Sequence, residues 1–229
     1  MSRIFDPENG FFTTMGKIWD LVWLSILWTV TSLGIVTMFT ASASMYYAVV
    51  KVIRRGRGYV TRSFFHAFKE NAKQGIILNA VALVAAVILY VDFRYAAYLR
   101  GQGSSLGTVF YVIFTCITFF LCFILVWINP ILSRFKITLK QLVLDSVLIS
   151  IRHFPTTFIM VAVLVGVVYL LYTYLPYIIV YGLFLIIPMV IPGVLCFLRS
   201  LLVERILKKY TPEAEGSEEE TGEDRWYLE

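Results

Sequence analysis

Long stretches of the chain contain no charged residue. Residues 76–91, 101–132 and 154–198 are uncharged over 16, 32 and 45 positions. A run of about 18 or more apolar residues is typical of a helix that crosses a membrane. The pattern therefore predicts an all-α, polytopic helical membrane protein, and the short alternating segments of a membrane β-barrel are absent from the sequence.

The first apolar segment, residues 18–53, has an ambiguous length. Its 36 positions are too many for one untilted span of about 20 residues and few for two. Small and hydroxylated residues interrupt it at positions 37–44. We predict a span that breaks between Ser32 and Thr40, followed by a short helix that returns toward the starting side. A single long, broken helix is the alternative.

Four further spans and a surface helix complete the predicted fold. Residues 133–153 alternate apolar and polar types at helical spacing, which is typical of an amphipathic helix on a membrane surface. With the first segment, the chain is predicted to have five to six membrane-inserted helices in one domain, residues 1–210. The predicted spans are residues 75–91, 106–128, 155–174 and 178–198.

Polar and proline-containing stretches set the predicted boundaries between these helices. Residues 92–105 are polar and contain glycines near their end, which predicts a loop. The Asn-Pro pair at 129–130 predicts the end of a span, and Pro176 predicts a tight connection. Pro188 and Pro192 fall inside the last span and predict a kink.

Composition and charge distinguish the main part of the chain, residues 1–210, from its C-terminal segment, residues 211–229. It is 59% hydrophobic and 15% charged, whereas soluble domains carry about 25% charged residues. Residues 1–210 hold 19 basic and 7 acidic side chains, but residues 211–229 hold 8 acidic and 1 basic. The C-terminal segment 211–229 is therefore predicted to be a disordered acidic tail.

The basic residues also predict an orientation in the membrane. They gather in segments 51–74 and 133–153 and at the C-terminal end, while residues 92–105 carry only two arginines. Because Lys and Arg stay on the cytoplasmic side, these three basic regions are predicted to be cytoplasmic. The N-terminus is inside if residues 18–53 form a hairpin and outside if they form one helix.

Residues 54–74, RRGRGYVTRSFFHAFKENAKQ, interleave basic and aromatic side chains. Nucleic-acid binders and membrane-surface segments both have this pattern. A segment directly between two spans cannot easily wrap a duplex, so we predict a helix with its phenylalanines among lipid headgroups and its cations toward anionic lipid. Ser63 is predicted to cap this helix and Asn71 to hydrogen-bond a neighbouring span. The candidate residues for membrane contact or partner docking are Arg54, Arg55, Arg57, Arg62, Ser63, Phe64, Phe65, Phe68, Lys69, Asn71, Lys73, Arg134, Lys140 and Arg152.

The sequence offers no candidate catalytic, cofactor or metal site. It contains no phosphate-binding G-x-x-x-x-G-K-[ST] loop, no H-E-x-x-H and no G-x-S-x-G. His66 and His153 lie in basic segments at the membrane edge, and Cys116, Cys122 and Cys196 lie inside apolar runs where cysteine packs as a small hydrophobe. We therefore predict a protein that is not an enzyme and needs no cofactor.

Two stretches resemble the YesL-like family of bacterial membrane proteins, a family of unknown function. They are SLGIVTMFTASASMYYAVVKVIRRGRGYVTRSFFHAFKENAKQGIIL and NPILSRFKITLKQLVLDSVLISIRHFPTTFIM. Gly34, Phe39 and Ala72 depart from the Pro, Gly and Phe of the family pattern. Matching positions are Leu33, Ile35, Val36, Thr37, Ala41, Tyr46, Tyr47, Ser63, Phe64, Phe65, Phe68, Lys69, Asn71, Lys73 and Gln74, and then Pro130, Arg134, Phe135, Ser150, Ile151, Arg152 and Pro155.

The resemblance implies a link to carbohydrate uptake. Genes of this family often lie beside those of sugar-binding proteins, sugar permeases and glycan-degrading enzymes in Gram-positive bacteria, which is an association and not a mechanism. The chain lacks the Glu-Ala-Ala loop by which importer permeases dock their ATPases. An accessory subunit is therefore favoured, with membrane lipids and a sugar ABC importer permease or a membrane sensor as partners, and no nucleic acid. The alternative is a small-solute transporter or channel, alone or as an oligomer.

Overall fold

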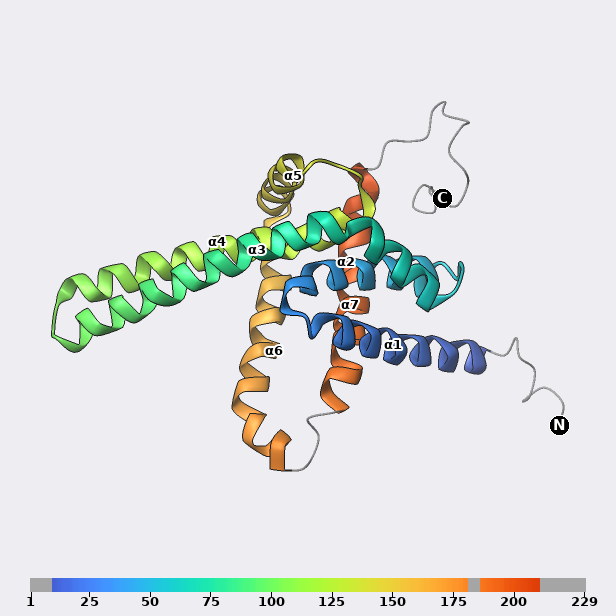
Figure 1. The fold of residues 1–229 in the computed structure, drawn as a ribbon, viewed down its shortest axis with the longest axis horizontal. Helices are drawn as coiled ribbons and strands as arrows, with labels where there is room; N and C mark the ends of the chain where they lie inside the picture. Colours follow the sequence, from blue (N-terminus) through green and yellow to red (C-terminus); the bar gives the residue numbers. More distant parts are fainter. Residues whose placement is uncertain (1–9, 181–185, 211–229) are drawn as a thin grey trace.

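A computed structural model describes residues 10–180 and 186–210, and every regular element in these ranges is helical (Figure 1). The predicted acidic tail, residues 211–229, lies outside the described residues. The long helices are α1 (Gly10–Ser32), α2 (Met38–Ala48), α3 (Val60–Gly101), α4 (Ser105–Arg134), α5 (Leu139–Arg152), α6 (Phe154–Val180) and α7 (Ile186–Leu207). Three short elements join or extend them, namely η1 (Ile35–Thr37), the π-helix η2 (Val49–Arg54) and η3 (Lys208–Tyr210).

Five helical segments among the described residues are long and apolar enough to cross a membrane, judged by length and composition. Helix α1 is not one of them, although α2 with its flanking turns is. The prediction of a polytopic, all-α membrane protein is confirmed. The five segments are Ile35–Arg54, Val60–Gly101, Ser105–Arg134, Phe154–Tyr174 and Ile187–Tyr210.

Helices α1 and α2 form a hairpin, as one of the two interpretations of residues 18–53 predicted. The chain breaks after Ser32 and reverses, so that α1 and α2 lie side by side (Figure 1). Trp28 Nε1 of α1 donates a hydrogen bond to Ser42 Oγ of α2 at 3.0 Å. Asn79 Nδ2 of α3 holds the turn by donating to the Ile35 carbonyl at 2.7 Å. A single long helix is therefore excluded.

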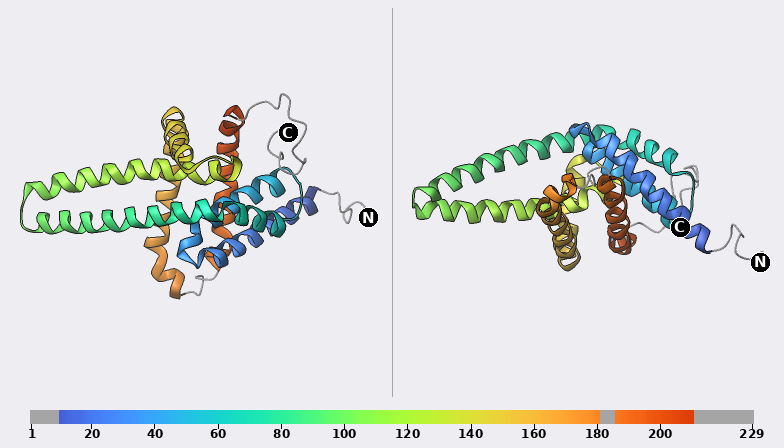
Figure 2. Two further views of the ribbon diagram at one scale, coloured as in Figure 1. Left: turned by 45° about the horizontal axis from the view of Figure 1, so that its top comes forward. Right: turned by 90° about the horizontal axis from the view of Figure 1, so that it is seen from below.

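Helices α3 and α4 pair as a long hairpin that projects from the rest of the molecule (Figure 2). The rings of Phe93 and Tyr111 meet across it with their centroids 5.3 Å apart. Gly107 permits close contact near the tip, because a Cβ at this position would lie 2.5 Å from the backbone nitrogen of Arg100. Many apolar side chains on the outer part of the hairpin are exposed, which suits a surface that meets lipid.

Helix α3 is longer than its sequence pattern suggests. The predicted loop at 92–105 is wrong for residues 92–101, which continue the helix to Gly101. Polar residues appear there, but Ala96 and Leu99 are good helix formers and nothing breaks the backbone pattern. The helix ends only before Gly103, whose φ of +76° suits glycine. The polar residues mark the end of the apolar surface and not the end of the helix.

Two prolines that were expected to end helices lie inside them. Helix α4 passes through Pro130 and ends at Arg134, so the predicted end at 129–130 is wrong. Helix α6 passes Pro176 and ends at Val180, so the tight connection predicted there is wrong as well. A proline removes one helical hydrogen bond, but neighbouring helices and polar side chains can compensate for this loss in a membrane protein.

Helix α1 supplies this compensation at the proline inside α7. Pro192 has no N–H and displaces the carbonyl four residues earlier, that of Pro188. Thr29 Oγ1 of α1 donates to this carbonyl at 3.0 Å. The Gly193 N–H donates to Ser25 Oγ of α1 at 2.9 Å. Two hydroxyl groups of one helix therefore satisfy backbone groups beside a proline in the other.

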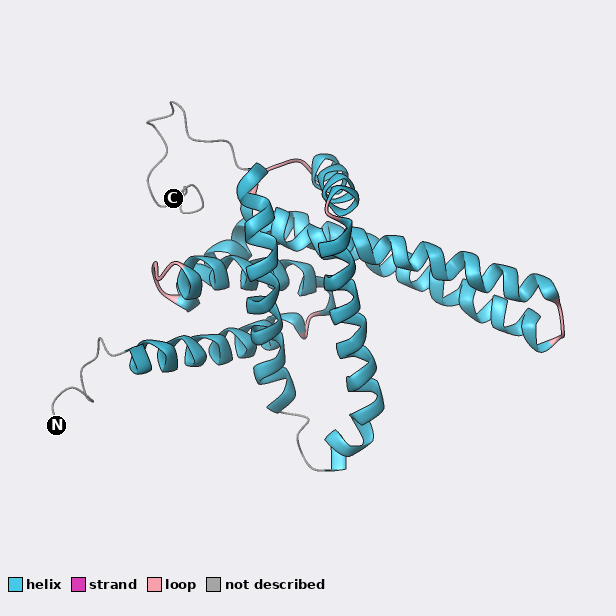
Figure 3. Cartoon of the chain, turned by 180° about the vertical axis from the view of Figure 1, so that it is seen from behind, coloured by secondary structure: helices cyan, strands magenta, loops and turns pink. Residues whose placement is uncertain are grey.

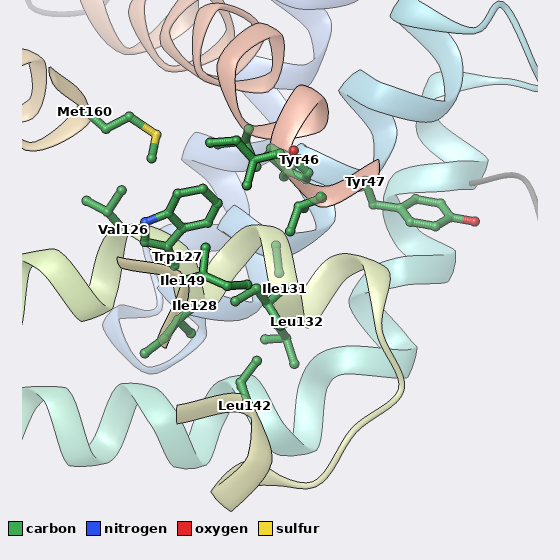
Figure 4. Packing of buried hydrophobic residues seen from close by; sticks show 14 of the residues in the cluster. Tyr46, Tyr47, Val126, Trp127, Ile128, Ile131, Leu132, Leu142, Ile149 and Met160 are labelled. Atoms are coloured by element: carbon green, nitrogen blue, oxygen red, sulfur yellow. The ribbon is translucent and has the colours of Figure 1, made fainter. Parts of the chain in front are cut away.

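Helices α6 and α7 run crosswise to the α3–α4 hairpin, as Figures 1 and 3 show from opposite sides. The larger core lies where these directions meet, around the fully buried Trp127 (Figure 4). Trp127 Nε1 of α4 donates to Thr157 Oγ1 of α6 at 2.9 Å, so the indole is both packed and hydrogen-bonded. Tyr46, Ile131, Leu142, Met160 and Val203 belong to the same cluster, which therefore joins α2, α4, α5, α6 and α7.

Because α1 and α7 cross closely at Gly193, any side chain at this position should lower the stability of the protein. A Cβ there would lie 2.5 Å from Ser25 Oγ and 2.6 Å from the Leu21 carbonyl oxygen. We expect Gly193→Ala to lower the free energy of unfolding by about 1–3 kcal/mol, because the helices must move apart. Gly166→Ala is the matched control, since a Cβ at that position of α6 meets nothing within 4 Å. Denaturation in detergent micelles measures both; equal stability of the two variants would contradict the crossing.

Candidate functional site

A buried ion pair joins the end of α4 to α7. Arg134 Nη1 lies 2.9 Å from Glu204 Oε2, and the two side chains are 1% and 3% exposed. The Tyr46 hydroxyl of α2 donates to the other carboxylate oxygen of Glu204 at 3.0 Å. A buried pair loses its hydration, so these additional hydrogen bonds are what make it tolerable. The ion pair fixes three elements at one end of the molecule.

Two arginines from the end of η2 approach the same region. Arg54 Nη1 donates to the Ser200 carbonyl of α7 at 2.6 Å. Burial lowers the pKa of Arg55 from its ordinary value, and nearby guanidinium groups lower it further, whereas the Glu204 carboxylate opposes this effect. Arginine remains protonated despite such a shift. The basic turn after η2 is therefore positioned against α7 and its carboxylate.

A polar groove of about 570 Å³ opens where α3 meets the chain that leaves α4. Gln74 Nε2 of α3 donates to the Ile137 carbonyl at 3.0 Å. Lys136 Nζ lies 3.6 Å from Glu70 Oε1 on the exposed rim. These contacts bring the predicted segments 51–74 and 133–153 together. Tyr47, Glu70, Asn71 and Gln74 line the groove on one side and residues 132–138 on the other.

A second groove, of about 600 Å³, runs along the start of α3. Trp23 Nε1 of α1 donates to Thr61 Oγ1 at its edge at 3.0 Å. His66 Nε2 lies 3.6 Å from Glu70 Oε2, one turn further along the helix. Cationic and aromatic groups dominate this surface, which suits contact with anions or lipid headgroups. The lining residues are Tyr59, Thr61, Arg62, Phe65, His66 and Lys69.

The C-terminal end of the described chain contacts α5. His153 Nε2 lies 3.1 Å from the Tyr210 hydroxyl, and the Arg152 guanidinium lies 5.5 Å from the centre of the Tyr210 ring. Burial lowers the pKa of His153, and the charges of Arg152 and Lys209 lower it further. Segments 51–74, 133–153 and 199–210 are thus joined to one another. We call these three segments together the basic end.

Most of the predicted docking cations lie on the surface. Among the fourteen candidate residues, Arg55, Phe68 and Asn71 are half-buried, and Ser63, Phe64 and Arg134 are buried. The exposed candidates are Arg54, Arg57, Arg62, Phe65, Lys69, Lys73, Lys140 and Arg152. Their role in membrane contact or partner docking stays a prediction.

Three details predicted for the basic–aromatic segment are wrong. Phe64 is fully buried and packs in a second core cluster with α1, α2 and η2, so it does not lie among headgroups. The helix begins earlier than expected, with Tyr59 at its N-cap position, so Ser63 lies within the first turns and does not cap it. Asn71 Nδ2 donates to the Ala67 carbonyl of its own helix, not to a neighbouring span.

Sequence reasoning missed the residues that hold the basic end together. The sequence could have pointed to Glu204, because it is the sole acid in the basic segment 199–210, which follows a long apolar run. Only the match to the family pattern marked Tyr46 and Gln74, since a tyrosine or a glutamine in a sequence does not indicate which residue it will bond. Gln74 makes the contact to another segment that was expected of Asn71.

The chemistry of the basic end suits binding. Across residues 10–180 and 186–210, no group of three or more His, Cys, Asp or Glu side chains could hold a metal ion. The exposed polar groups are mostly guanidinium, ammonium, amide and phenol groups, which donate hydrogen bonds to anionic and carbonyl-bearing surfaces.

Comparison with known proteins supports the resemblance seen in the sequence. The family described as "Protein of unknown function, DUF624" matches residues 21–93, from α1 to the outer half of α3. The uncharacterized protein YesL of Bacillus subtilis (strain 168) is 26% identical over 172 residues, which cover 73% of this chain and 79% of that protein. The chain is therefore similar to the YesL-like family, most clearly over α1 to α3. No solved structure matches this chain.

The buried ion pair between Arg134 and Glu204 predicts a large loss of stability when one partner is removed. Glu204→Gln leaves Arg134 without its counter-charge, and we expect a loss of about 3–5 kcal/mol in the free energy of unfolding. The double variant Arg134→Met with Glu204→Leu should recover most of this loss, because neither charge then remains buried.

Lys136→Gln is the control for this prediction. It breaks an ion pair whose lysine side chain is 78% exposed, so the expected change is below about 1 kcal/mol. Denaturation in detergent micelles measures all three variants. Wild-type stability of Glu204→Gln would contradict the assigned role of the pair.

Proposed function

We propose that this chain is an accessory membrane subunit that docks through its basic end onto the cytoplasmic side of a carbohydrate importer. The proposal rests on one observation: three basic segments that are far apart in the sequence contact one another in the fold. Arg54 links the first to the third, Gln74 the first to the second, and His153 the second to the third. A surface that is ordered before binding loses less entropy on association.

The charge of the basic end supports a docking role. Its three segments contain only the acids Glu70, Asp145 and Glu204, and Glu204 is buried in its ion pair. A surface of one sign attracts a surface of the opposite sign, and raises the rate of association more than the final affinity. The exposed cations are Arg54, Arg57, Arg62, Lys69, Lys73, Lys136, Lys140, Arg152, Arg205, Lys208 and Lys209.

The identity of the partner comes from the family resemblance, and the cytoplasmic orientation from the bias of Lys and Arg toward that side. The partner should present an acidic surface at the membrane edge, and an importer permease is the partner we propose. The transporter or channel alternative draws less support, because both grooves described above lie at the basic end and neither is lined by residues 75–131.

Reversing exposed charges on α3 tests the proposal. Lys69→Glu with Lys73→Glu should reduce co-purification with a sugar importer permease about tenfold at low salt, because two attractive contacts become repulsive. The effect should shrink in 0.5 M salt, where the Debye length is only about 4 Å. Quantitative mass spectrometry of complexes isolated in a mild detergent is the measurement.

Arg94→Glu with Arg100→Glu is the matched control, since it reverses two exposed charges at the opposite end of the same helix. We expect this variant to co-purify like the wild type. Equal permease recovery with both double variants would overturn docking through the basic end. Unchanged uptake of every glycan after gene deletion would overturn the link to carbohydrate uptake.

A further inference from the structure

Arg199 has an unusual position in α7. It is the first charged residue after the 45 uncharged positions 154–198, at the level where the helix leaves its apolar stretch. The Nε and Nη2 atoms of Arg199 are shielded from solvent and have no hydrogen-bond partner among the described residues. A buried guanidinium usually has a carboxylate or several carbonyl partners, because an unpaired buried charge costs several kcal/mol in lost hydration.

The nearby carboxylate does not supply this partner. Both oxygens of Glu204 are already engaged, one with Arg134 at 2.9 Å and the other with Tyr46 at 3.0 Å. Arg199 and Glu204 are five residues apart, which places them roughly 140° apart around the helix axis. The ionisable groups that interact with the charge of Arg199 are Tyr46 and Cys196, which are neutral at ordinary pH. Arg199 is therefore a half-buried cation whose charge the nearby acid does not balance.

An apolar stripe lies beside Arg199 on the outer face of α7. Val194, Leu198, Leu201 and Leu202 are all at least 38% exposed and share one side of the helix. Arg199 lies roughly 60° around the helix from Leu202, between this stripe and the buried Val203. A molecule with an anionic head and apolar tails would match both features, since its head can meet the guanidinium while its tails cover the stripe.

We propose that Arg199 is a binding site for the phosphate group of an anionic phospholipid, whose acyl chains lie along the outer face of α7. Guanidinium and phosphate form charge-assisted, often bidentate hydrogen bonds. Because Nε and Nη2 have no exposed surface in the described structure, the Arg199 side chain must turn toward the stripe to present these two donors to the phosphate. Basic pockets between membrane helices bind lipid headgroups in this way. Arg199 is the first residue of segment 199–210 of the basic end, but it is not one of the exposed cations proposed for docking, so the lipid site does not depend on that proposal.

The replacement Arg199→Met tests the site, because it removes the charge and keeps an apolar side chain of similar length. In detergent without phospholipid, we expect this variant to have a higher melting temperature than the wild type, since a half-buried cation with two shielded, unpaired donors is removed. Added phosphatidylglycerol should raise the melting temperature of the wild type and leave that of Arg199→Met nearly unchanged. By native mass spectrometry, the variant should bind this lipid at least about tenfold more weakly, since the loss of even one charge-assisted hydrogen bond accounts for that change.

Arg205→Met is the matched control, because Arg205 is an exposed cation on the same helix. It should bind phosphatidylglycerol like the wild type. Diglucosyldiacylglycerol, which has acyl chains but no phosphate, should bind all three proteins equally. Wild-type affinity of Arg199→Met for phosphatidylglycerol, or a lower melting temperature of this variant without lipid, would overturn the proposal.

Two further experiments identify the source of the anion that binds Arg199. Inorganic phosphate alone should not raise the melting temperature of the wild type; if it does so, and not for Arg199→Met, the ligand is a soluble phosphate and the lipid is refuted. A chain that lacks residues 211–229 should keep its stabilisation by phosphatidylglycerol. If this deletion lowers the melting temperature of the wild type but not of Arg199→Met, the chain's own acidic segment supplies the counter-charge and the lipid is again refuted.

Discussion

The ion pair between Arg134 and Glu204 is the contact on which the basic end depends. It connects the last residue of α4 to α7 in a place without solvent, and Tyr46 adds a third element to the same carboxylate. Because neither charge can leave this position cheaply, α2, α4 and α7 keep one relative arrangement there. The groove beside Arg134 and the packing of the C-terminal end against α5 are built around this arrangement.

Elsewhere the helices are held together by a few polar contacts within extensive apolar packing. Lipid offers little hydrophobic drive for helix association, so small residues and hydroxyl groups at the crossings gain importance. Gly193 lets α7 approach α1, and the hydroxyls of Ser25 and Thr29 then satisfy backbone groups beside Pro192. Trp127 and Thr157 play a comparable part between α4 and α6. A proline in a membrane helix is thus tolerated where a neighbour supplies the missing partners.

The sequence predicted the elements whose cause is local hydropathy. The long uncharged runs specified the helical membrane class, and the break after Ser32 was visible in the small residues that follow it. Hydropathy could not predict that α3 continues from residue 92 to Gly101, because polarity reports the surroundings of a helix and not its backbone. The burial of Phe64 was likewise hidden, since it depends on α1 and α2 packing over that face of α3.

The candidate site shows the same division between local and distant causes. The basic segments were evident from composition, and their cations are largely exposed as expected for a surface. The residues that join the segments were missed, because Glu204 and Gln74 act on partners 70 and 63 positions away in the chain. Such pairs follow from the tertiary fold, and no spacing rule within one helix can reveal them.

The length of helix α3 has a consequence for its position in a membrane. It is unbroken from Val60 to Gly101, and at 1.5 Å per residue its 42 residues extend for about 63 Å, twice the roughly 30 Å of a bilayer's apolar layer. Its first turns belong to the basic end and its last turn to the tip of the hairpin. An upright helix would therefore leave about half of its length outside the apolar layer, so α3 must tilt strongly or extend well beyond that layer.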